Sequence, residues 1–236
     1  MDMKVSKNQV DRLGDRLRSG PIVESDLGLL DDYRRSFGDA YEIVVCTIRE
    51  KLKLEPTGRP AKSTPSIIEK LRRESIRLSQ IQDIAGCRII VADILEQDRV
   101  IAALGALFPG ASVIDRRVNP TYGYRAVHVI PRVSEKLIEI QIRSSLQHLW
   151  AEVSEKLSDV MDPAIKYGGG EATVRRILDK SSSMVAKQES TEQGLAKLRN
   201  EAANEPEILR MDENTARTRV LISELLSEMI SGWERP

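Results

Sequence analysis

The chain has 236 residues, of which 41% are hydrophobic, and its 36 Lys and Arg residues balance its 36 Asp and Glu residues. This composition excludes intrinsic disorder, and zero net charge gives no sign of the basic surface of a general nucleic-acid-binding protein. No apolar run reaches the roughly 20 residues that cross a bilayer, and the N-terminus lacks the apolar middle of a signal peptide. We therefore expect a cytoplasmic protein with two reduced core cysteines, Cys46 and Cys87.

Residues 6–55 have a helical pattern. Apolar side chains recur at steps of three and four and form one stripe. The stripe comprises Leu30, Tyr33, Phe37, Tyr41, Val44, Val45 and Ile48. The segment KLEPTGRPAKSTP then predicts a charged loop, because it carries proline, glycine and basic residues. Thr64 as the cap and Pro65 as the first helical residue predict a short helix after this loop.

The middle of the chain changes period. Four short segments rich in Val and Ile, separated by turn residues and by the helix-like ILEQDRVIAALGALF, predict a sheet of about four strands with a crossover helix. The segments are CRIIVAD, ASVIDRRV, YRAVHVIPRV and KLIEIQIRS. In the last of these, strict alternation places Glu139, Gln141 and Arg143 on one face and three isoleucines on the other. An ordinary solvated strand would show the same alternation.

After Ser144 the pattern is helical. SLQHLWAEVSEKL carries one apolar stripe, and two longer amphipathic stretches follow the glycine run YGGG. Such a pair predicts an antiparallel helical hairpin that packs on the core or on another subunit.

Two carboxylates lie where the predicted strands carry charge. Asp83 precedes one strand, Glu139 lies midway along a later one, and many Lys and Arg residues lie between them. A buried carboxylate needs a cation, a metal or several donors. This set suits a metal-dependent enzyme for a polyphosphate substrate, in which side chains hold the phosphates because no Walker or Rossmann glycine motif is present. The structural alternative is a buried salt bridge with Arg88 or Arg143.

Four motifs occur in one order: RPAKSTPSIIEK, DIAGCR, GYRAVH and EIQIRSSLQHLWAE. Together, from about Arg59 to Tyr167, they resemble the synthetase domain of the RelA/SpoT family, which makes the alarmones (p)ppGpp. The resemblance implies an α+β fold, a nucleotidyltransferase-like mixed sheet flanked by helices. It divides the chain into N-terminal helices (1–58), a synthetase core (59–167) and a C-terminal helical hairpin (168–236).

The family's reaction moves the β,γ-pyrophosphate of ATP to the 3′-hydroxyl of GDP or GTP and releases AMP. The resemblance implies that Asp83 and Glu139 bind Mg²⁺, and that Glu139 accepts the proton of the attacking hydroxyl. The residues matched to ATP binding are Arg59, Lys62, Ser66, Lys70 and Arg88. The residues matched or offered for acceptor binding are Arg116, Arg117, Tyr124, His128, Gln141 and Arg143. Tyr124 would stack on the acceptor base, with His128 on the same strand and face.

The chain departs from the family pattern in the acceptor loop. The family often has lysines there, whereas DRRVNPTYGY offers Arg116 and Arg117 further upstream and Tyr122 beside the turn glycine. Other charged or aromatic residues have simpler interpretations. Arg72, Arg73 and Arg77 are expected on a solvated helix face, His148 and Trp150 in or near the core, and Lys166 and Tyr167 at a helix end or near the substrate.

Three functions compete. The first is a small, single-domain alarmone synthetase acting on GDP or GTP and assembling as a homo-oligomer through its C-terminal helices. The second is the toxic branch of the same family, which pyrophosphorylates the 3′ end of tRNA or makes (p)ppApp and could have an antitoxin partner. The third is a catalytically silent module that binds nucleotides or other proteins. Joint retention of Asp83, Tyr124 and Glu139 counts against the third.

Overall fold

The computed structural model describes residues 6–202 and 205–233, so the first five residues and the last three lie outside the described part of the chain. The N-terminal helices are α1 (Lys7–Ser19), α2 (Glu24–Arg35) and α3 (Gly38–Thr47). A π-helical turn, η1 (Ile48–Leu52), follows α3 directly. The predicted apolar stripe is buried, but it crosses two helices, since the chain turns between α2 and α3. Cys46 is exposed on α3, so its predicted place in the core was wrong, whereas Cys87 is buried.

The charged loop contains a strand that the sequence did not indicate. Strand β1 (Thr57–Arg59) pairs antiparallel with the next strand, in a register that places Arg59 opposite Gly86. Helix α4 (Thr64–Arg73) follows, and its N-cap is Ser63, whose hydroxyl accepts from the Ser66 backbone N–H. The predicted cap, Thr64, was therefore wrong by one residue.

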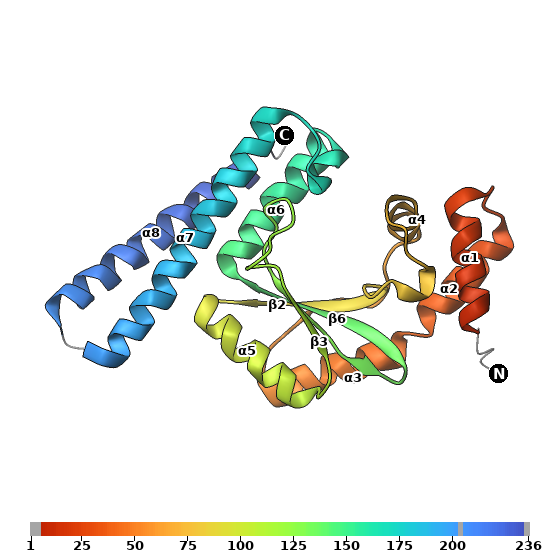
Figure 1. The fold of residues 1–236 in the computed structure, drawn as a ribbon, viewed down its shortest axis with the longest axis horizontal. Coiled ribbons are helices and arrows are strands. Elements are labelled where there is room, and N and C mark those ends of the chain that lie inside the picture. Colours follow the sequence, from red (N-terminus) through yellow and green to blue (C-terminus); the bar gives the residue numbers. More distant parts are fainter. Residues whose placement is uncertain (1–5, 203–204, 234–236) are drawn as a thin grey trace. The chain divides into compact units, whose positions relative to one another are not determined.

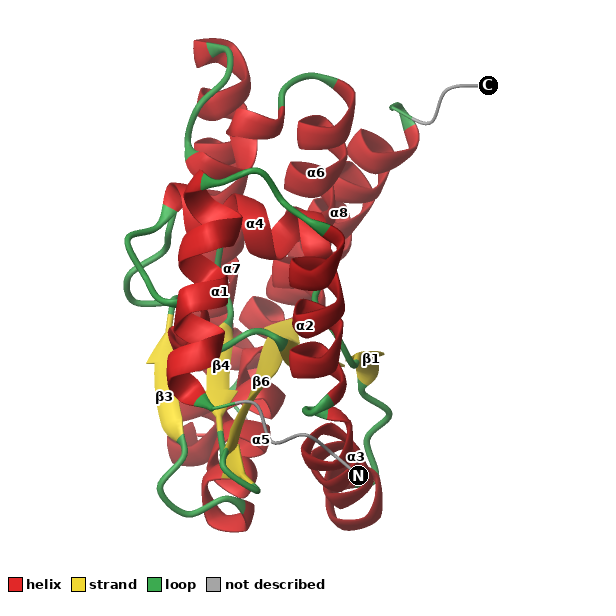
Figure 2. Ribbon diagram, turned by 90° about the vertical axis from the view of Figure 1, so that its right-hand side faces the viewer, coloured by secondary structure: helices red, strands yellow, loops and turns green. Residues whose placement is uncertain are grey.

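The sheet has six strands among the described residues, in the order β1-β2-β6-β4-β3, with β5 paired to β6. Figure 2 shows β4 between β3 and β6. The remaining strands are β2 (Ala85–Val91), β3 (Ser112–Asp115), β4 (Val127–Ile130), β5 (Arg132–Val133) and β6 (Lys136–Ser144), with α5 (Ile94–Leu107) connecting β2 to β3. The prediction of about four strands missed β1 and β5, because two or three residues are too few to show a period.

Strand β6 has the predicted two-faced pattern. Ile138, Ile140 and Ile142 are fully buried, at 0% exposure, while Glu139 and Gln141 are half-buried. The apolar face anchors the strand in the core, so the orientation of the polar face is fixed by register.

Gly86 in β2 allows the backbone of β6 to approach closely. A Cβ atom at this position would lie 2.4 Å from the carbonyl oxygen of Glu139. We expect Gly86→Ala to destabilise the protein by about 1–3 kcal/mol in urea unfolding. Gly105→Ala is the matched control, because a Cβ there meets nothing within 4 Å and alanine favours helix α5 by about 0.5–1 kcal/mol. Equal effects of the two variants would contradict this packing argument.

The C-terminal part comprises α6 (Ser145–Val160), the 3-10 turn η3 (Pro163–Tyr167), α7 (Ala172–Ala202) and α8 (Pro206–Ser231). Helices α7 and α8 are the predicted helical hairpin. Ser144 caps α6 in a capping box with Gln147. In Figure 1, α7 and α8 run side by side in opposite directions, and both pack on α6. Their shared core includes Leu146, Trp150, Leu178, Ile222 and Leu226.

The chain forms two compact units. The first unit contains the residues up to Ile89 together with Gly105–Val113 and Val129–Gln141; the second contains Ile90–Leu104, Ile114–His128 and the chain from Ile142 on. The long strand β6 therefore contributes Glu139 and Gln141 to the first unit and Arg143 to the second. No helix in the described part of the chain is long and apolar enough to cross a membrane.

Candidate active site

Asp83 is held by two lysines in the first unit. Lys62 Nζ donates to Asp83 Oδ2 at 2.6 Å, and Lys70 Nζ donates to Oδ1 at 2.9 Å. Lys62 is fixed by its own backbone N–H, which donates to the Ile84 carbonyl, and Lys70 projects from α4. The cations that neutralise this carboxylate are therefore the two lysines matched to ATP.

The two lysines control the acidity of Asp83. Burial raises the pKa of its carboxyl, but the charges and hydrogen bonds of Lys62 and Lys70 outweigh burial and lower the pKa from 3.8 to about 2. The side chain is 21% exposed, so bulk solvent screens this group only in part.

The lowered pKa of Asp83 predicts a pH dependence of stability. Because its folded-state pKa lies below the unfolded value, ionised Asp83 contributes roughly 2 kcal/mol above pH 4, and this is lost as pH falls from about 4 to 2. Urea unfolding of the wild type should therefore lose more stability over that interval than unfolding of Asp83→Asn. If the free energy of unfolding changed with pH in the same way in both proteins, the lowered pKa of Asp83 would be refuted.

Both carboxylates line one pocket of about 190 Å³, here called the Asp83 pocket. Its lining residues are Thr57, Gly58, Arg59, Asp83, Gly86, Cys87, Arg88, Glu139 and Gln141. The strand order brings them together, since β2 lies between β1 and β6. Gln141 Nε2 donates to Glu139 Oε2 at 2.7 Å and so orients the second carboxylate.

Cys87 in the Asp83 pocket is a neutral thiol. Burial, and then the charge of Glu139, raise the pKa of this thiol to about 12. It is therefore unsuited to act as a nucleophile or metal ligand near neutral pH.

The Asp83 pocket fits a metal ion that is shared with a substrate. Within the described residues, no group of three or more His, Cys, Asp or Glu side chains is placed to hold a metal. Mg²⁺ is usually held by one or two carboxylates together with substrate phosphates and water, and not by an all-protein cage. The donor set of Asp83 and Glu139 matches that mode of binding.

Most of the residues predicted to bind the acceptor lie in the second unit. Tyr124 Oη lies 3.1 Å from His128 Nε2 and accepts from Arg143 Nη2, also at 3.1 Å. Tyr124 precedes β4, which begins only at Val127, so its predicted place on the strand with His128 was wrong. The guanidinium of Arg143 lies 5.0 Å from the centre of the Tyr124 ring. Stacking of a base on that face would require Arg143 to move.

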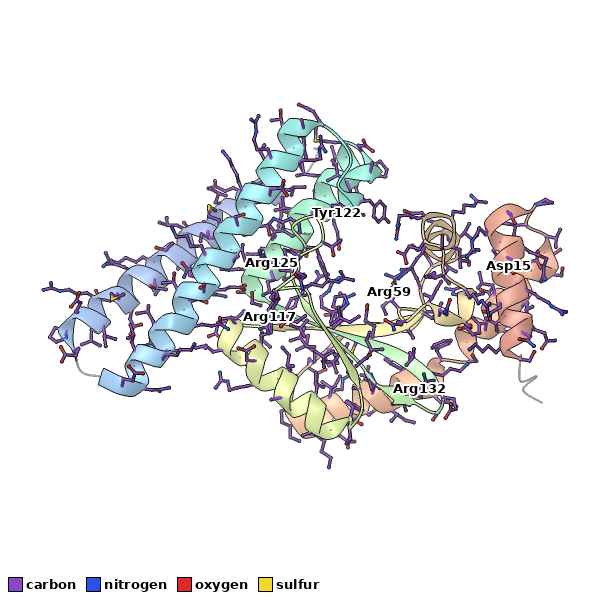
Figure 3. All side chains as sticks on the ribbon, viewed as in Figure 1. Asp15, Arg59, Arg117, Tyr122, Arg125 and Arg132 are labelled. Atoms are coloured by element: carbon purple, nitrogen blue, oxygen red, sulfur yellow. The ribbon has the colours of Figure 1, made fainter. Side chains whose placement is uncertain are left out.

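The two arginines of the acceptor loop have partners within the protein. Arg117 forms ion pairs with Asp115 and Asp98, each at 2.6 Å. Arg116 Nη1 donates to the Thr121 hydroxyl at 2.6 Å. Arg125, which the sequence analysis did not single out, donates to the Arg117 carbonyl at 2.6 Å. Figure 3 labels Arg117, Tyr122 and Arg125, which all come from the segment between β3 and β4.

A buried polar network at the N-terminal end of α6 was not predicted from the sequence. Gln147 Nε2 donates to both carboxylate oxygens of Glu189 and to Gln97 Oε1, and the Ser144 hydroxyl donates to Glu189. Burial raises the pKa of Glu189, while the hydrogen bonds from Ser144 and Gln147 oppose this. The S-x-x-Q capping box could have indicated Gln147, but no local signal pointed to Gln97 or Glu189.

The charged and aromatic residues with simpler interpretations lie in or near the core or at the surface. Trp150 is 3% exposed, which confirms its place in the core, and His148 lies at 3.3 Å from Glu152 on the same helix. Arg72, Arg73 and Arg77 are exposed, as expected of a solvated face. Lys166 donates to Asp159 at 3.2 Å.

Comparison with known proteins finds a protein-family model that matches the middle of the chain. A protein-family model described as a region found in RelA / SpoT proteins matches residues 58–158.

Two curated relatives cover different shares of the chain. Uncharacterized protein Rv1366 of Mycobacterium tuberculosis (strain H37Rv) is 39% identical over 172 residues, which are 69% of this chain and 62% of that protein. GTP pyrophosphokinase YjbM of Bacillus subtilis is 35% identical over 117 residues, 43% of this chain and 54% of that protein. The chain thus spans somewhat less than two thirds of the length of these relatives.

Solved structures with a similar fold include small alarmone synthetase 1 of Bacillus subtilis bound to its product pppGpp. That chain is 25% identical, has a TM-score of 0.53, and is matched over 100% of its length and 77% of this chain. Another structure of the same synthetase has 27% identity and a TM-score of 0.52, with 72% of this chain covered. The predicted α+β fold is confirmed by this likeness.

Proposed function

Because residues 58–158 match the RelA/SpoT family model and the fold is similar to that of a small alarmone synthetase, we propose that the protein transfers the β,γ-pyrophosphate of ATP to the 3′-hydroxyl of GDP or GTP. The 3′-oxygen forms a bond to the β-phosphorus, the bond between that phosphorus and the α,β-bridging oxygen breaks, and AMP leaves. The observation that supports this most strongly is that Asp83 and Glu139 line the same pocket together with Arg59 and Arg88.

The lysines beside Asp83 are proposed to bind the phosphates of ATP. In the described structure both ammonium groups bind the Asp83 carboxylate. Each ammonium has three donors, so it can contact a phosphate oxygen and keep one bond to the carboxylate. The Asp83 pocket, at about 190 Å³, lies below the usual 300–1,000 Å³ of sites that enclose a whole ligand, so it suits the phosphates and not the entire nucleotide.

Asp83 and Glu139 would also hold Mg²⁺. When bound, the ion would neutralise phosphate charge and help to align the attacking and leaving oxygens. Arg59 and Arg88 line the same pocket and add fixed positive charge where negative charge grows on the departing phosphate. Ser66, whose hydroxyl lies 2.8 Å from that of Ser63 at the start of α4, is proposed as a further phosphate contact.

Glu139 is proposed as the general base. Its carboxylate is oriented by Gln141, and its place on the rigid strand β6 limits its motion. It would accept the proton of the 3′-hydroxyl as the oxygen attacks, which is typically worth about 10²–10⁴-fold in rate.

On the acceptor side, Tyr124, His128 and Arg143 form one hydrogen-bonded group. We propose that they contact the acceptor nucleotide once Arg143 leaves the Tyr124 ring, with Arg116 and Arg117 nearby in the chain.

A test of the proposed pyrophosphate transfer incubates the purified protein with γ-labelled ATP and, in turn, GDP, GTP, ATP or bulk tRNA. Label on GDP or GTP supports the proposal. Transfer to ATP or tRNA would instead assign the protein to the toxic branch, and no transfer to any acceptor would indicate a silent module.

The C-terminal helices are proposed to mediate self-association. Ile222 and Leu226 of α8 are buried against α6 and α7, yet Leu221 is 63% exposed and Leu225 46%. These exposed leucines, with Leu209 and Val220, leave apolar surface on α8 that a second copy could cover. Sedimentation equilibrium that gives only the monomer mass would refute this proposal.

A further inference from the structure

A buried polar network joins helix α7 to the unit that carries most of the proposed acceptor residues. Every residue of the Asp83 pocket belongs to the first unit, whereas this network lies entirely in the second. The proposed reaction does not use its side chains, and α7 lies outside residues 58–158, which the family model matches. The members, each at most 4% exposed, are Gln97, Ser144, Gln147 and Glu189.

The carboxamides of Gln97 and Gln147 form a reciprocal pair at the centre of the network. Gln97 Nε2 donates to Gln147 Oε1 at 2.9 Å, and Gln147 Nε2 donates back to Gln97 Oε1 at 3.2 Å. Gln97 Nε2 also donates to the Ile142 carbonyl at 2.8 Å, and its Oε1 accepts from Arg117 Nη1 at 3.2 Å. Both donors and both lone pairs of the Gln97 amide are therefore used. The pair thus connects the backbone just before Arg143 with the side chain of Arg117.

Glu189 holds this amide pair from α7. Gln147 Nε2 donates to its two carboxylate oxygens at 3.1 and 3.0 Å, and the Ser144 hydroxyl donates to it as well. Ser144 follows Arg143 directly and is the N-cap of α6. A buried polar network in which each side chain has partners is rigid and favours one arrangement. Glu189 therefore fixes the backbone that carries Arg143.

A second contact of α7 reaches the segment before β4. The Ser182 hydroxyl donates to the Gly123 carbonyl at 2.6 Å and accepts from Arg125 Nε at 3.2 Å. Arg125 Nη1 in turn donates to the Arg117 carbonyl. Ser182 and Glu189 lie about two turns apart on α7 and so project from the same face. One face of this helix thus holds both the acceptor loop and the end of β6.

We propose that Glu189 is a positioning residue for the acceptor nucleotide. Through Ser144 it holds Arg143, and through the amide pair it holds Arg117. It acts through these residues because its own side chain is buried. Replacing a buried charged group by apolar side chains is often neutral or stabilising, so stability alone does not account for a carboxylate here. The inference rests on the proposed function, since it concerns the acceptor of that reaction.

Isothermal titration calorimetry of the full-length protein tests this inference without turnover. The ligands are GDP and the α,β-methylene analogue of ATP, in which carbon replaces the oxygen at the bond that the proposed reaction breaks. Glu189→Gln sets an amide against the Gln147 amide, and Gln147→Glu sets two carboxylates together. We expect each variant to raise the Kd for GDP at least about tenfold and to leave the Kd for the ATP analogue within about twofold.

The double variant Gln147→Glu/Glu189→Gln exchanges the donor and the acceptor of this hydrogen bond. It should restore the Kd for GDP to within about threefold of the wild type, because the two changes compensate each other. The control is Ile222→Ala, which removes buried packing between α8 and its neighbours but does not touch the network. It should lower the melting temperature measured by circular dichroism and leave both Kd values within about twofold.

Three results would overturn the proposal. The first is a lowered melting temperature with an unchanged Kd for GDP in the single variants, which would make the network purely stabilising. The second is equal weakening of GDP and the ATP analogue, and the third is a double variant that binds GDP no better than either single variant. Glu189→Gln introduces no charge, so it tests the proposal even if Gln147→Glu fails to fold.

Transfer of label from γ-labelled ATP to GDP by the wild type separates this proposal from the proposed function. If the wild type transfers label and Glu189→Gln binds GDP equally well, only the positioning role is refuted. If the wild type binds GDP but transfers no label, the proposed function is refuted, and the GDP affinities of the variants still decide whether Glu189 positions the nucleotide. A wild type that does not bind GDP would overturn both.

Discussion

Asp83→Ala is expected to abolish pyrophosphate transfer, with a fall of at least about 10³-fold in kcat/KM for ATP. The substitution removes one of two carboxylates from the Asp83 pocket and leaves the ammonium groups of Lys62 and Lys70 without their shared partner. Both losses act at the same place, because those lysines are the proposed phosphate ligands. The measurement is initial rate with labelled ATP at saturating Mg²⁺.

The matched control for this variant is Asp39→Ala, which removes an exposed carboxylate from the start of α3 in the same unit. It should keep activity within about twofold, since surface substitutions usually change stability by no more than about 0.5 kcal/mol. Because Asp83→Ala also costs stability, its folded fraction must be measured under the assay conditions. A folded Asp83→Ala protein that retains a tenth or more of the activity would contradict the assignment.

Glu139→Gln is expected to lower kcat by about 10²–10⁴-fold, with a smaller change in KM for ATP. The amide keeps the size of the side chain and its place on β6, but it cannot accept the proton of the attacking hydroxyl. The contribution of Glu139 as a base would therefore be lost while the pocket keeps its shape. Steady-state kinetics with ATP and GDP would measure both constants.

Glu135→Gln is the control for that change, since Glu135 is exposed just before β6 and lines no described pocket of the active site. It should leave both constants nearly unchanged. If Glu139→Gln alters only KM, the residue binds substrate or metal without acting as the base.

The sequence predicted the apolar framework well, because long periodic segments report burial directly. The three isoleucines of β6 lie on the core face, and Leu226 of the C-terminal hairpin is buried as its periodicity indicated. Leu221 and Leu225, which the same periodicity placed on the apolar stripe, are exposed. The joint lining of one pocket by Asp83 and Glu139 also agrees with the expectation that they converge. Their chemical roles stay predictions.

The sequence could not predict features that depend on contacts between distant residues. Strand β1 forms only because Thr57–Arg59 finds a partner in β2. The pairing of Asp83 with two lysines at once depends on how α4 packs, and the cover of Tyr124 by Arg143 depends on the turn before β4. The left-handed conformation of Tyr122 is hidden too, since tyrosine has no intrinsic preference for it.

The most direct test of the proposed reaction is the identity of the adenine product. The purified protein, ATP, GDP and Mg²⁺ are incubated together, and nucleotides are separated and identified by mass spectrometry. Transfer of pyrophosphate predicts AMP and a guanosine product carrying two additional phosphates at the 3′ position, in equal amounts. Release of ADP with a singly phosphorylated product, or AMP without any modified guanosine, would contradict the proposed function.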